Sequence, residues 1–362
     1  MKTSGPLTGL RILEIESIGP GPFAAMMLAD LGANVLQVGR PGPSRRAPNP
    51  VLYRNRAGSV ALDLKSSAGK AALLDLVAQA DGLIEGYRPG VMERLGLGPD
   101  ACTERNVRLV YGRITGWGRS GPLAHTAGHD INYIALSGVL HACGTAESGP
   151  LPPLNLVGDF GGGGLMLAFG MVSAILESRQ SGHGQVVDAA MVDGAASLMA
   201  MMYGMRAAGR WPAERAGNLF DGSAWFYTTY RCADGQWVAV GAIEAEFRRA
   251  LLDALGFGVE SETLMRRPDQ DADMRARLQT IFGSQPRAHW QALLEHTDAC
   301  VTPVLSLDEV PDHAQNQAMG SVRMIEGVAS PMPAPRFSRT APQEPVLAAR
   351  PGLIDNWMLP AL

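Results

Sequence analysis

The sequence predicts an α/β protein with a mostly parallel sheet, and two observations lead to this fold class. Short runs of aliphatic residues alternate with helix-like stretches through the first third of the chain. The chain also has 362 residues, of which 46% are hydrophobic, so it can bury a large core and divide into two domains. Strands that alternate with helices form parallel sheets that helices cover on both faces.

The predicted elements begin with one βαβ unit. The runs "LRILEIE" (10–16) and "ANVLQVGR" (33–40) are typical of strands, and the segment 19–32 between them is typical of a turn and a helix. The turn "GPGPFA" lacks the spacing of a dinucleotide fingerprint, and its two prolines remove N–H groups that a pyrophosphate would use. The pattern then repeats, with strands predicted at 59–65, 81–87 and 108–115 and helices at 67–80 and near 90–95.

The rest of the chain changes character. Long helices are predicted at 164–180 and 189–209, an antiparallel hairpin around "ADGQ" within 218–247, and a helical stretch at 273–299. The proline-rich segment 329–345 is typical of an extended return across the first domain. We therefore predict a large α/β domain at 1–210, a linker at 211–225, a small α+β domain at 226–320, and an extended return with the C-terminal part of the large domain at 321–362.

Composition excludes several classes of partner. The formal net charge is −4, and the basic residues form no tract suited to a nucleic-acid backbone. The four cysteines, Cys102, Cys143, Cys232 and Cys300, lie far apart without a CxxC pair, which favours reduced thiols over disulfides or a metal site. No signal pattern opens the chain and no uninterrupted apolar run reaches membrane length. We expect a cytoplasmic protein that binds neither nucleic acid nor membrane and holds no metal.

The stretch "AGHDINYIALSG" (127–138) contains the first candidate for proton chemistry. His129 stands at the head of an apolar run, where a histidine can simply cap a helix. Gly128 leaves room for close approach, and a helix that begins near Asp130 would present free backbone N–H groups to an anion. A proton carrier beside an oxyanion site is the arrangement that enolate chemistry requires.

The stretch "NLVGDFGGGG" (155–164) contains the second candidate. Asp159 can cap the helix that follows. A cap does not explain the glycines at 161–164, which weaken a helix and remove side chains where a ligand could approach. Glu244, in "VAVGAIEAEF", ends a strand-like run, and the pattern alone does not separate it from Glu246.

At these positions the chain resembles the family III CoA transferases, and within them a subgroup of racemases that act on 2-methylacyl-CoA thioesters. The matching stretches are "IGPGPFAAMMLADLGANV", "LIEGYRPGVMERLGLGP", "TGWGRSGP", "AGHDINYIALSG", "PPLNLVGDFGGGG", "GQVVDAAMVDG", "VAVGAIE" and "MPAPRFSRT". They span nearly the whole chain in order. The resemblance implies a large Rossmann-like domain, a smaller α+β domain and an interlocked homodimer.

The resemblance also implies roles for the candidate residues. His129 and Asp159 would take and return the α-proton on opposite faces of an enolate, and Glu244 would orient the imidazole from the partner chain. The two proton carriers would titrate as a coupled pair. No cofactor is implied, because CoA is part of the substrate. The implied contacts to CoA and the acyl group are Arg40, Lys65, Tyr87, Arg88, Arg94, Asp130, Tyr133 and Asn155.

Three alternatives remain open from the sequence. A family III CoA transferase would use Asp159 as a covalent carboxylate nucleophile, and would not be expected to have the "GHDINY" histidine. A non-catalytic acyl-CoA-binding protein would need no proton pair. The methionines of the 189–209 stretch could pack in a core or line a path for varied acyl chains; they are Met191, Met199, Met201, Met202 and Met205.

Overall fold

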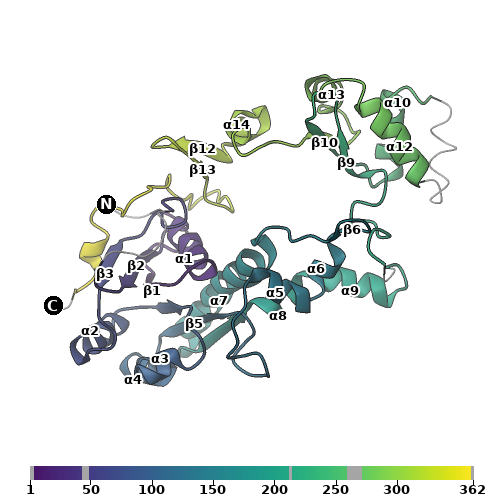
Figure 1. Ribbon diagram of the computed structural model, residues 1–362. Coiled ribbons are helices and arrows are strands. Elements are labelled where there is room, and N and C mark those ends of the chain that lie inside the picture. Colours follow the sequence, from purple (N-terminus) through teal and green to yellow (C-terminus); the bar gives the residue numbers. More distant parts are fainter. Residues whose placement is uncertain (1–3, 43–48, 212–213, 259–270, 360–362) are drawn as a thin grey trace. The chain divides into compact units, whose positions relative to one another are not determined.

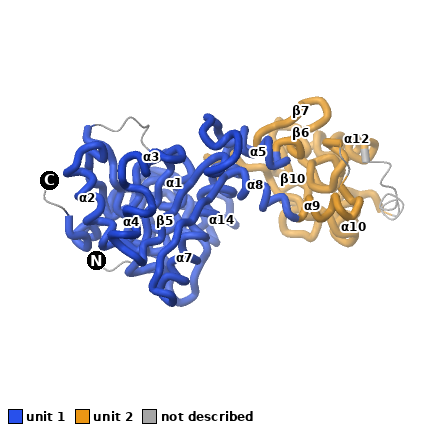
Figure 2. The backbone as a smooth tube through the Cα atoms, turned by 90° about the horizontal axis from the view of Figure 1, so that it is seen from below, with its two compact units in different colours: residues 1–139, 153–200, 311–362 blue, residues 140–152, 201–310 orange. Residues whose placement is uncertain are grey.

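The computed structural model describes residues 4–42, 49–211, 214–258 and 271–359. The chain divides into two compact units, which Figure 2 colours separately. Unit 1 contains residues 1–139, 153–200 and 311–362, and unit 2 contains residues 140–152 and 201–310. Residues 140–152 belong to the smaller unit 2, although they fall within the range 1–210 predicted as the large domain. The predicted domain boundaries stay a prediction, and residues 212–213 of the predicted linker lie outside the described residues.

Unit 1 is built on a six-stranded sheet in the order β3-β2-β1-β4-β5-β8, with every neighbouring pair parallel (Figure 1). The parallel sheet predicted from the alternating pattern is thus confirmed. The strand order reverses direction between β1 and β4, so the carboxyl ends of these two strands flank a crevice where α/β proteins bind ligands. The strands are β1 (Arg11–Ile15), β2 (Asn34–Gly39), β3 (Gly58–Ala61), β4 (Gly82–Glu85), β5 (Val110–Thr115) and β8 (Val186–Ala190).

Helices cover both faces of this sheet, because successive strand residues point to opposite sides. On one face Ile12 and Ile84 pack with α1 (Pro20–Asp30) and α7 (Met166–Ser181). On the other face Leu13 packs with the remaining helices of this region, which are α2 (Ser67–Val77), α3 (Val91–Arg94) and α4 (Pro99–Arg105). Each face therefore buries its own apolar cluster.

The long helix predicted at 164–180 begins earlier than expected. A π-helical segment, η1 (Leu156–Leu165), runs directly into α7, so Asp159 lies inside the helix and Asn155 occupies the N-cap position. The joined run Leu156–Ser181 is long and apolar enough to cross a membrane, with a mean hydropathy of 1.5. The sequence did not predict an apolar run of this length. One such helix is weak evidence for a membrane span, and this one packs against α1, α8 and β5.

The glycines at 161–164 serve helix packing, which corrects the interpretation that they admit a ligand. A Cβ on Gly162 would lie 2.6 Å from the backbone nitrogen of Ala195, and one on Gly164 would lie 2.8 Å from the Pro20 carbonyl oxygen. The backbone of η1 therefore contacts α8 (Met191–Leu198) and the start of α1 directly. The single helix predicted at 189–209 is also wrong, since β8, α8 and α9 (Ala200–Ala207) share this range.

Short helices and connections complete the first two thirds of the chain. A helix begins at Asp130, as the sequence predicts, and α4 was not predicted. The remaining segments are α5 (Asp130–Leu136), α6 (Val139–Ala142), and the paired two-residue strands β6 (Gly144–Thr145) and β7 (Gly149–Pro150).

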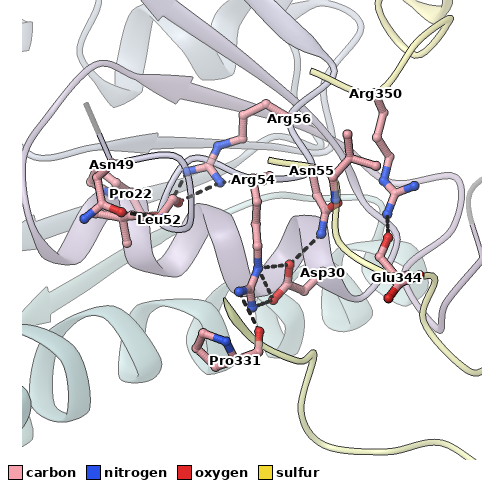
Figure 3. Close-up of polar contacts among 11 residues, drawn as sticks. Pro22, Asp30, Asn49, Leu52, Arg54, Asn55, Arg56, Pro331, Glu344 and Arg350 are labelled. Atoms are coloured by element: carbon pink, nitrogen blue, oxygen red, sulfur yellow. Dashed lines mark hydrogen bonds and ion pairs between the residues drawn. The ribbon is translucent and has the colours of Figure 1, made fainter. Parts of the chain in front are cut away.

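The C-terminal segment lies against the N-terminal part of unit 1 through partly buried polar contacts (Figure 3). Arg54 pairs with Asp30 at 2.5 Å and also donates to the Pro331 carbonyl oxygen at 2.7 Å. Asn55 accepts the Val346 N–H at 2.9 Å. Part of the segment differs from the predicted extended chain, because β12 (Val322–Ile325) and β13 (Val328–Pro331) form a hairpin after α14 (Ala314–Met319). Two short turns are η3 (Val310–Asp312) and η4 (Ile354–Asn356).

Unit 2 contains a three-stranded antiparallel sheet in the order β11-β10-β9. The hairpin predicted around "ADGQ" is confirmed as β9 (Tyr227–Arg231) and β10 (Trp237–Gly241), and β11 (Val301–Pro303) pairs with β10. The helical stretch predicted at 273–299 is two helices, because Pro286 has no N–H to continue the first. The helices are α10 (Ala245–Ala254), α12 (Asp271–Phe282) and α13 (Arg287–Leu294).

Candidate active site

A cavity of about 330 Å³ opens in unit 1 at the carboxyl ends of β1, β4 and β5. The residues that follow these strands line it: Ile18 and Gly19 after β1, Tyr87 after β4, and Thr115 and Trp117 at the end of β5. The cavity thus occupies the crevice at which the strand order reverses. Its wall also contains His129, Tyr133, Asp159 and Met191.

His129 occupies the N-cap position of α5, and its side chain is exposed. The backbone is held in place by local contacts: its N–H donates to Asn132 Oδ1 at 3.0 Å, and the preceding carbonyl of Gly128 accepts the Tyr133 hydroxyl at 2.5 Å. Tyr133 and Trp117 meet edge to face, with ring centroids 4.8 Å apart. A Cβ on Gly128 would lie 2.8 Å from both rings, so glycine at this position lets the two aromatic rings close the cavity wall beside His129.

Asp159 enters the same cavity from η1. Its Oδ2 accepts a hydrogen bond from Asn155 Nδ2 at 3.0 Å, and its backbone N–H donates to Asp130 Oδ1 at 2.6 Å. Burial raises the pKa of Asp159 above its ordinary value; the Asn155 hydrogen bond opposes this, the Asp130 charge adds to it, and the charge of His129 opposes it. His129 and Asp159 thus line the same cavity from two different elements.

A second cavity, of about 530 Å³, lies at the carboxyl ends of β2 and β3. Arg40 and Lys65 line it, and both side chains are exposed. Tyr87 and Arg88 line both cavities, so the β4 to α3 loop forms their shared wall. This cavity combines three cations with apolar residues such as Leu95, a combination that suits a ligand with phosphates and an adenine ring.

The structure brings most of the predicted site residues to these two cavities. Asp130 and Asn155 line neither of them, but both contact Asp159. Arg94 is exposed on α3 and also lines neither. Glu244 lies in unit 2, exposed at the N-cap position of α10, and Glu246 is exposed in the first turn of the same helix.

Sequence reasoning missed part of the cavity wall. Ile18, Gly19, Thr115 and Trp117 were not proposed as site residues, although each lies just after, or at the end of, a predicted strand, where ligands of parallel sheets bind. Of the five methionines considered, Met191 is buried and lines the first cavity. The other four are partly or fully exposed in this chain, so the core-packing interpretation holds for Met191 alone.

The fold and the two cavities define a class: an α/β protein with cavities at the point where the order of its parallel sheet reverses, one of them lined by cations and the other by a histidine and a carboxylic acid. Comparison with known proteins gives the family. Residues 7–353 match the family model described as CoA-transferase family III. The chain belongs to CoA-transferase family III.

Individual relatives agree with this assignment. The chain is 45% identical over 340 residues to the α-methylacyl-CoA racemase of Mus musculus, covering 92% of this chain and 87% of the relative. It is 44% identical to the α-methylacyl-CoA racemase of Homo sapiens, with the same coverage of both chains. Among solved structures, a CAIB/BAIF family protein from Brucella suis superposes with a TM-score of 0.77 at 25% identity, covering 96% of this chain and 97% of that one.

Proposed function

We propose that this chain is a racemase that interconverts the (2R) and (2S) forms of 2-methylacyl-CoA thioesters by proton transfer through an enolate. The observation that carries the proposal is that His129 and Asp159, from two different elements, line one cavity. Identities of 45% and 44% to racemases over 92% of the chain support an isomerase that acts on acyl-CoA.

The chemistry requires two proton carriers. The α-proton of a thioester is far less acidic than any side chain, so a base must remove it while the developing enolate is stabilised. Inversion follows when the second group returns a proton to the opposite face. In one direction His129 would accept the proton and Asp159 would donate, and in the other direction they would exchange roles. The raised pKa of Asp159 supports a role as the proton donor.

The second cavity would hold the CoA part of the substrate. Arg40, Lys65 and Arg88 supply positive charge for its phosphates. The wall that Tyr87 and Arg88 share between the two cavities would let the pantetheine arm pass from one to the other. For Arg94, which lies outside both cavities, a role in CoA binding stays a prediction.

Three further parts of the proposal concern the assembled protein. We propose a homodimer in which Glu244 of one chain orients His129 of the other, since Glu244 lies in unit 2 and outside the cavity-bearing unit. The reaction needs no cofactor, because side chains alone carry the proton. The four cysteines are all free, which supports a reducing, cytoplasmic location.

The test is proton NMR of one epimer of a 2-methylacyl-CoA incubated with the protein in D₂O, with and without an added carboxylic acid. A racemase exchanges the α-proton for deuterium and equalises the epimers without the acid. Transfer of CoA to the acid with the α-proton retained would instead establish a transferase that uses Asp159 as nucleophile. Binding without either reaction would leave a non-catalytic acyl-CoA-binding protein.

A further inference from the structure

The side chains of Asp130 and Asn155 contact two different groups of Asp159. Asp130 is buried, and its Oδ1 accepts the Asp159 N–H at 2.6 Å. Asn155 is exposed, and its Nδ2 donates to the Asp159 carboxylate oxygen Oδ2 at 3.0 Å. One neighbour is therefore an acceptor that holds the Asp159 backbone, and the other is a donor to the Asp159 side chain.

The local sequence is fitted to the Asp130 contact. A Cβ on Gly158 would lie 2.5 Å from Asp130 Oδ1, so only glycine lets the carboxylate reach the next backbone N–H. The second oxygen, Asp130 Oδ2, is buried and has no hydrogen-bond partner within the part of the chain that the structure describes. A buried carboxylate oxygen without a partner is unfavourable, so the hydrogen bond of Oδ1 to the Asp159 N–H compensates for burying this side chain.

The other elements that pack against η1 contribute few charges near Asp159. The charged or titratable groups that line the cavity with Asp159 are Tyr87, Arg88, His129 and Tyr133. The start of α1 presents Gly19, and α8 presents Met191, neither of which titrates. The other charged groups on these elements lie elsewhere. Asp193 of α8 is exposed, and the charges of Arg113 in β5 and Asp188 in β8 influence the pKa of Glu85. Glu177 and Arg179 lie near the C-terminal end of α7.

We infer that Asp130 is a positioning residue that holds Asp159 in place and favours its protonated form, while Asn155 favours the ionised form. A negative charge close to a carboxyl group opposes its ionisation, and a donor to the carboxylate supports ionisation. The directions in which the two residues move the pKa of Asp159 agree with this assignment. The inference rests on the proposed function, and a role of these two side chains in substrate binding stays a prediction.

A two-base racemase needs one carrier protonated and the other unprotonated before each turnover. Asp130 and Asn155 would therefore act in opposite directions on the fraction of Asp159 that can serve as the proton donor.

The first test measures the protonation of Asp159 directly and does not depend on activity. The protein is labelled with aspartate carrying ¹³C at the carboxyl carbon, and the Asp159 resonance is assigned by its loss in Asp159→Asn. Titration of this resonance should move to lower pH in Asp130→Asn, which keeps the acceptor oxygen but removes the charge. It should move to higher pH in Asn155→Ala, which removes the donor.

A matched control separates this effect from any loss of charge nearby. Asp193→Asn removes one exposed negative charge from α8, which packs against η1, and should leave the Asp159 titration unchanged. An unchanged titration in folded Asp130→Asn, or an equal shift in Asp193→Asn, overturns the inference. If Asp130→Asn does not fold, Asn155→Ala still decides, because a downward or absent shift in that exposed variant contradicts the opposing roles.

The second test asks whether the reaction follows the same titration. For the epimer that uses Asp159 as donor, the alkaline limb of kcat/KM should shift to lower pH in Asp130→Asn and to higher pH in Asn155→Ala. Limbs that stay fixed while the ¹³C titration moves would overturn the link to catalysis. Absence of α-proton exchange in the wild-type protein would count against the proposed function, and the ¹³C titration would still decide the contact of Asp130 with Asp159.

Discussion

At the scale of single residues, the cavities separate groups that handle the reacting carbon from groups that hold the remote part of the ligand. His129 and Asp159 lie in the first cavity, and Arg40 and Lys65 line only the second. Contacts that are equal in the ground state and the transition state appear in KM, and contacts at the reacting atoms appear in kcat. Substitutions in the two cavities should therefore have different kinetic signatures.

Arg40→Ala should raise KM for the acyl-CoA by about ten- to a hundredfold with little change in kcat, because a charge-assisted contact to phosphate contributes about 1.5 to 3 kcal/mol. Steady-state kinetics at fixed ionic strength measures this split. Arg179→Ala, an exposed arginine on α7 away from both cavities, is the matched control and should leave both constants unchanged. A fall in kcat without a rise in KM for Arg40→Ala would place the CoA elsewhere.

Glu85 predicts a pH dependence of stability. It is buried at the end of β4, where its Oε2 accepts the Tyr87 N–H at 2.7 Å and its Oε1 lies 3.4 Å from Arg113 Nε. Burial raises its pKa from the ordinary value of 4.5 to about 7. The folded protein therefore keeps a proton on Glu85 that the unfolded chain releases, and this stability is fully present below pH 4.5 and is lost as the pH rises through about 7.

The free energy of unfolding should thus fall between pH 4.5 and pH 7.5 by on the order of 3 kcal/mol more in the wild type than in Glu85→Gln, at about 1.4 kcal/mol per unit of pKa. Urea denaturation of both proteins at the two pH values measures the difference. Equal pH dependence of the two proteins would show that Glu85 has an ordinary pKa in the folded state.

At the scale of elements, the direct contact between η1 and α8 places Asp159. Gly162 and Gly194 let the two backbones touch, since a Cβ on Gly194 would lie 1.8 Å from the Gly162 carbonyl oxygen. This packing fixes the position of η1, and with it the position of Asp159 in the cavity wall. The glycines therefore support the site by position, although none of them lines it.

Gly162→Ala should destabilise the protein by about 1 to 3 kcal/mol, because the new methyl group overlaps the α8 backbone, which cannot move as a side chain would. The control is Gly204→Ala in α9, where a Cβ meets nothing within 4 Å. That change should be neutral or stabilising by up to about 1 kcal/mol, because alanine favours helix. Chemical denaturation compares them, and equal stability of the two variants would contradict the packing role.

At the scale of the whole molecule, the division of the chain separates the predicted catalytic residues. His129 and Asp159 belong to unit 1, and Glu244 belongs to unit 2. A site completed by a partner chain would combine residues from two copies, as closed two-fold dimers allow. The proposed homodimer can therefore be tested by combining two inactive variants.

Mixing His129→Ala protein with Glu244→Ala protein, under conditions of subunit exchange, should restore activity. Each mixed dimer would keep one intact site, so random exchange should return up to about a quarter of wild-type activity. Each variant alone should be impaired, and two copies of the same variant should not complement. Verified mixed dimers that stay inactive, although both variants fold and bind CoA, would exclude a role of Glu244 across the interface.

The sequence by itself determined the class of fold and the two candidate proton carriers. Strand and helix periodicity is a local property, so the parallel elements and the β9–β10 hairpin could be predicted from neighbouring residues alone. The pairing of "GHDINY" with "NLVGDFGGGG" indicated His129 and Asp159 before any contact was known. Family resemblance then supplied Glu244 and the CoA contacts, which no spacing in the chain could reveal.

The tertiary structure decided what each supporting residue touches. Asp130 of α5 contacts Asp159, and the glycines at 161–164 pack against α8 and α1, because helices far apart in sequence meet there. Asn155 contacts Asp159 from one helical turn earlier in the same segment. Trp117 and Met191 also line the first cavity because the fold brings together segments that are distant in sequence. Such contacts depend on distances across the fold that no local pattern encodes, since a glycine that admits a ligand and a glycine that admits a helix are the same letter in the sequence.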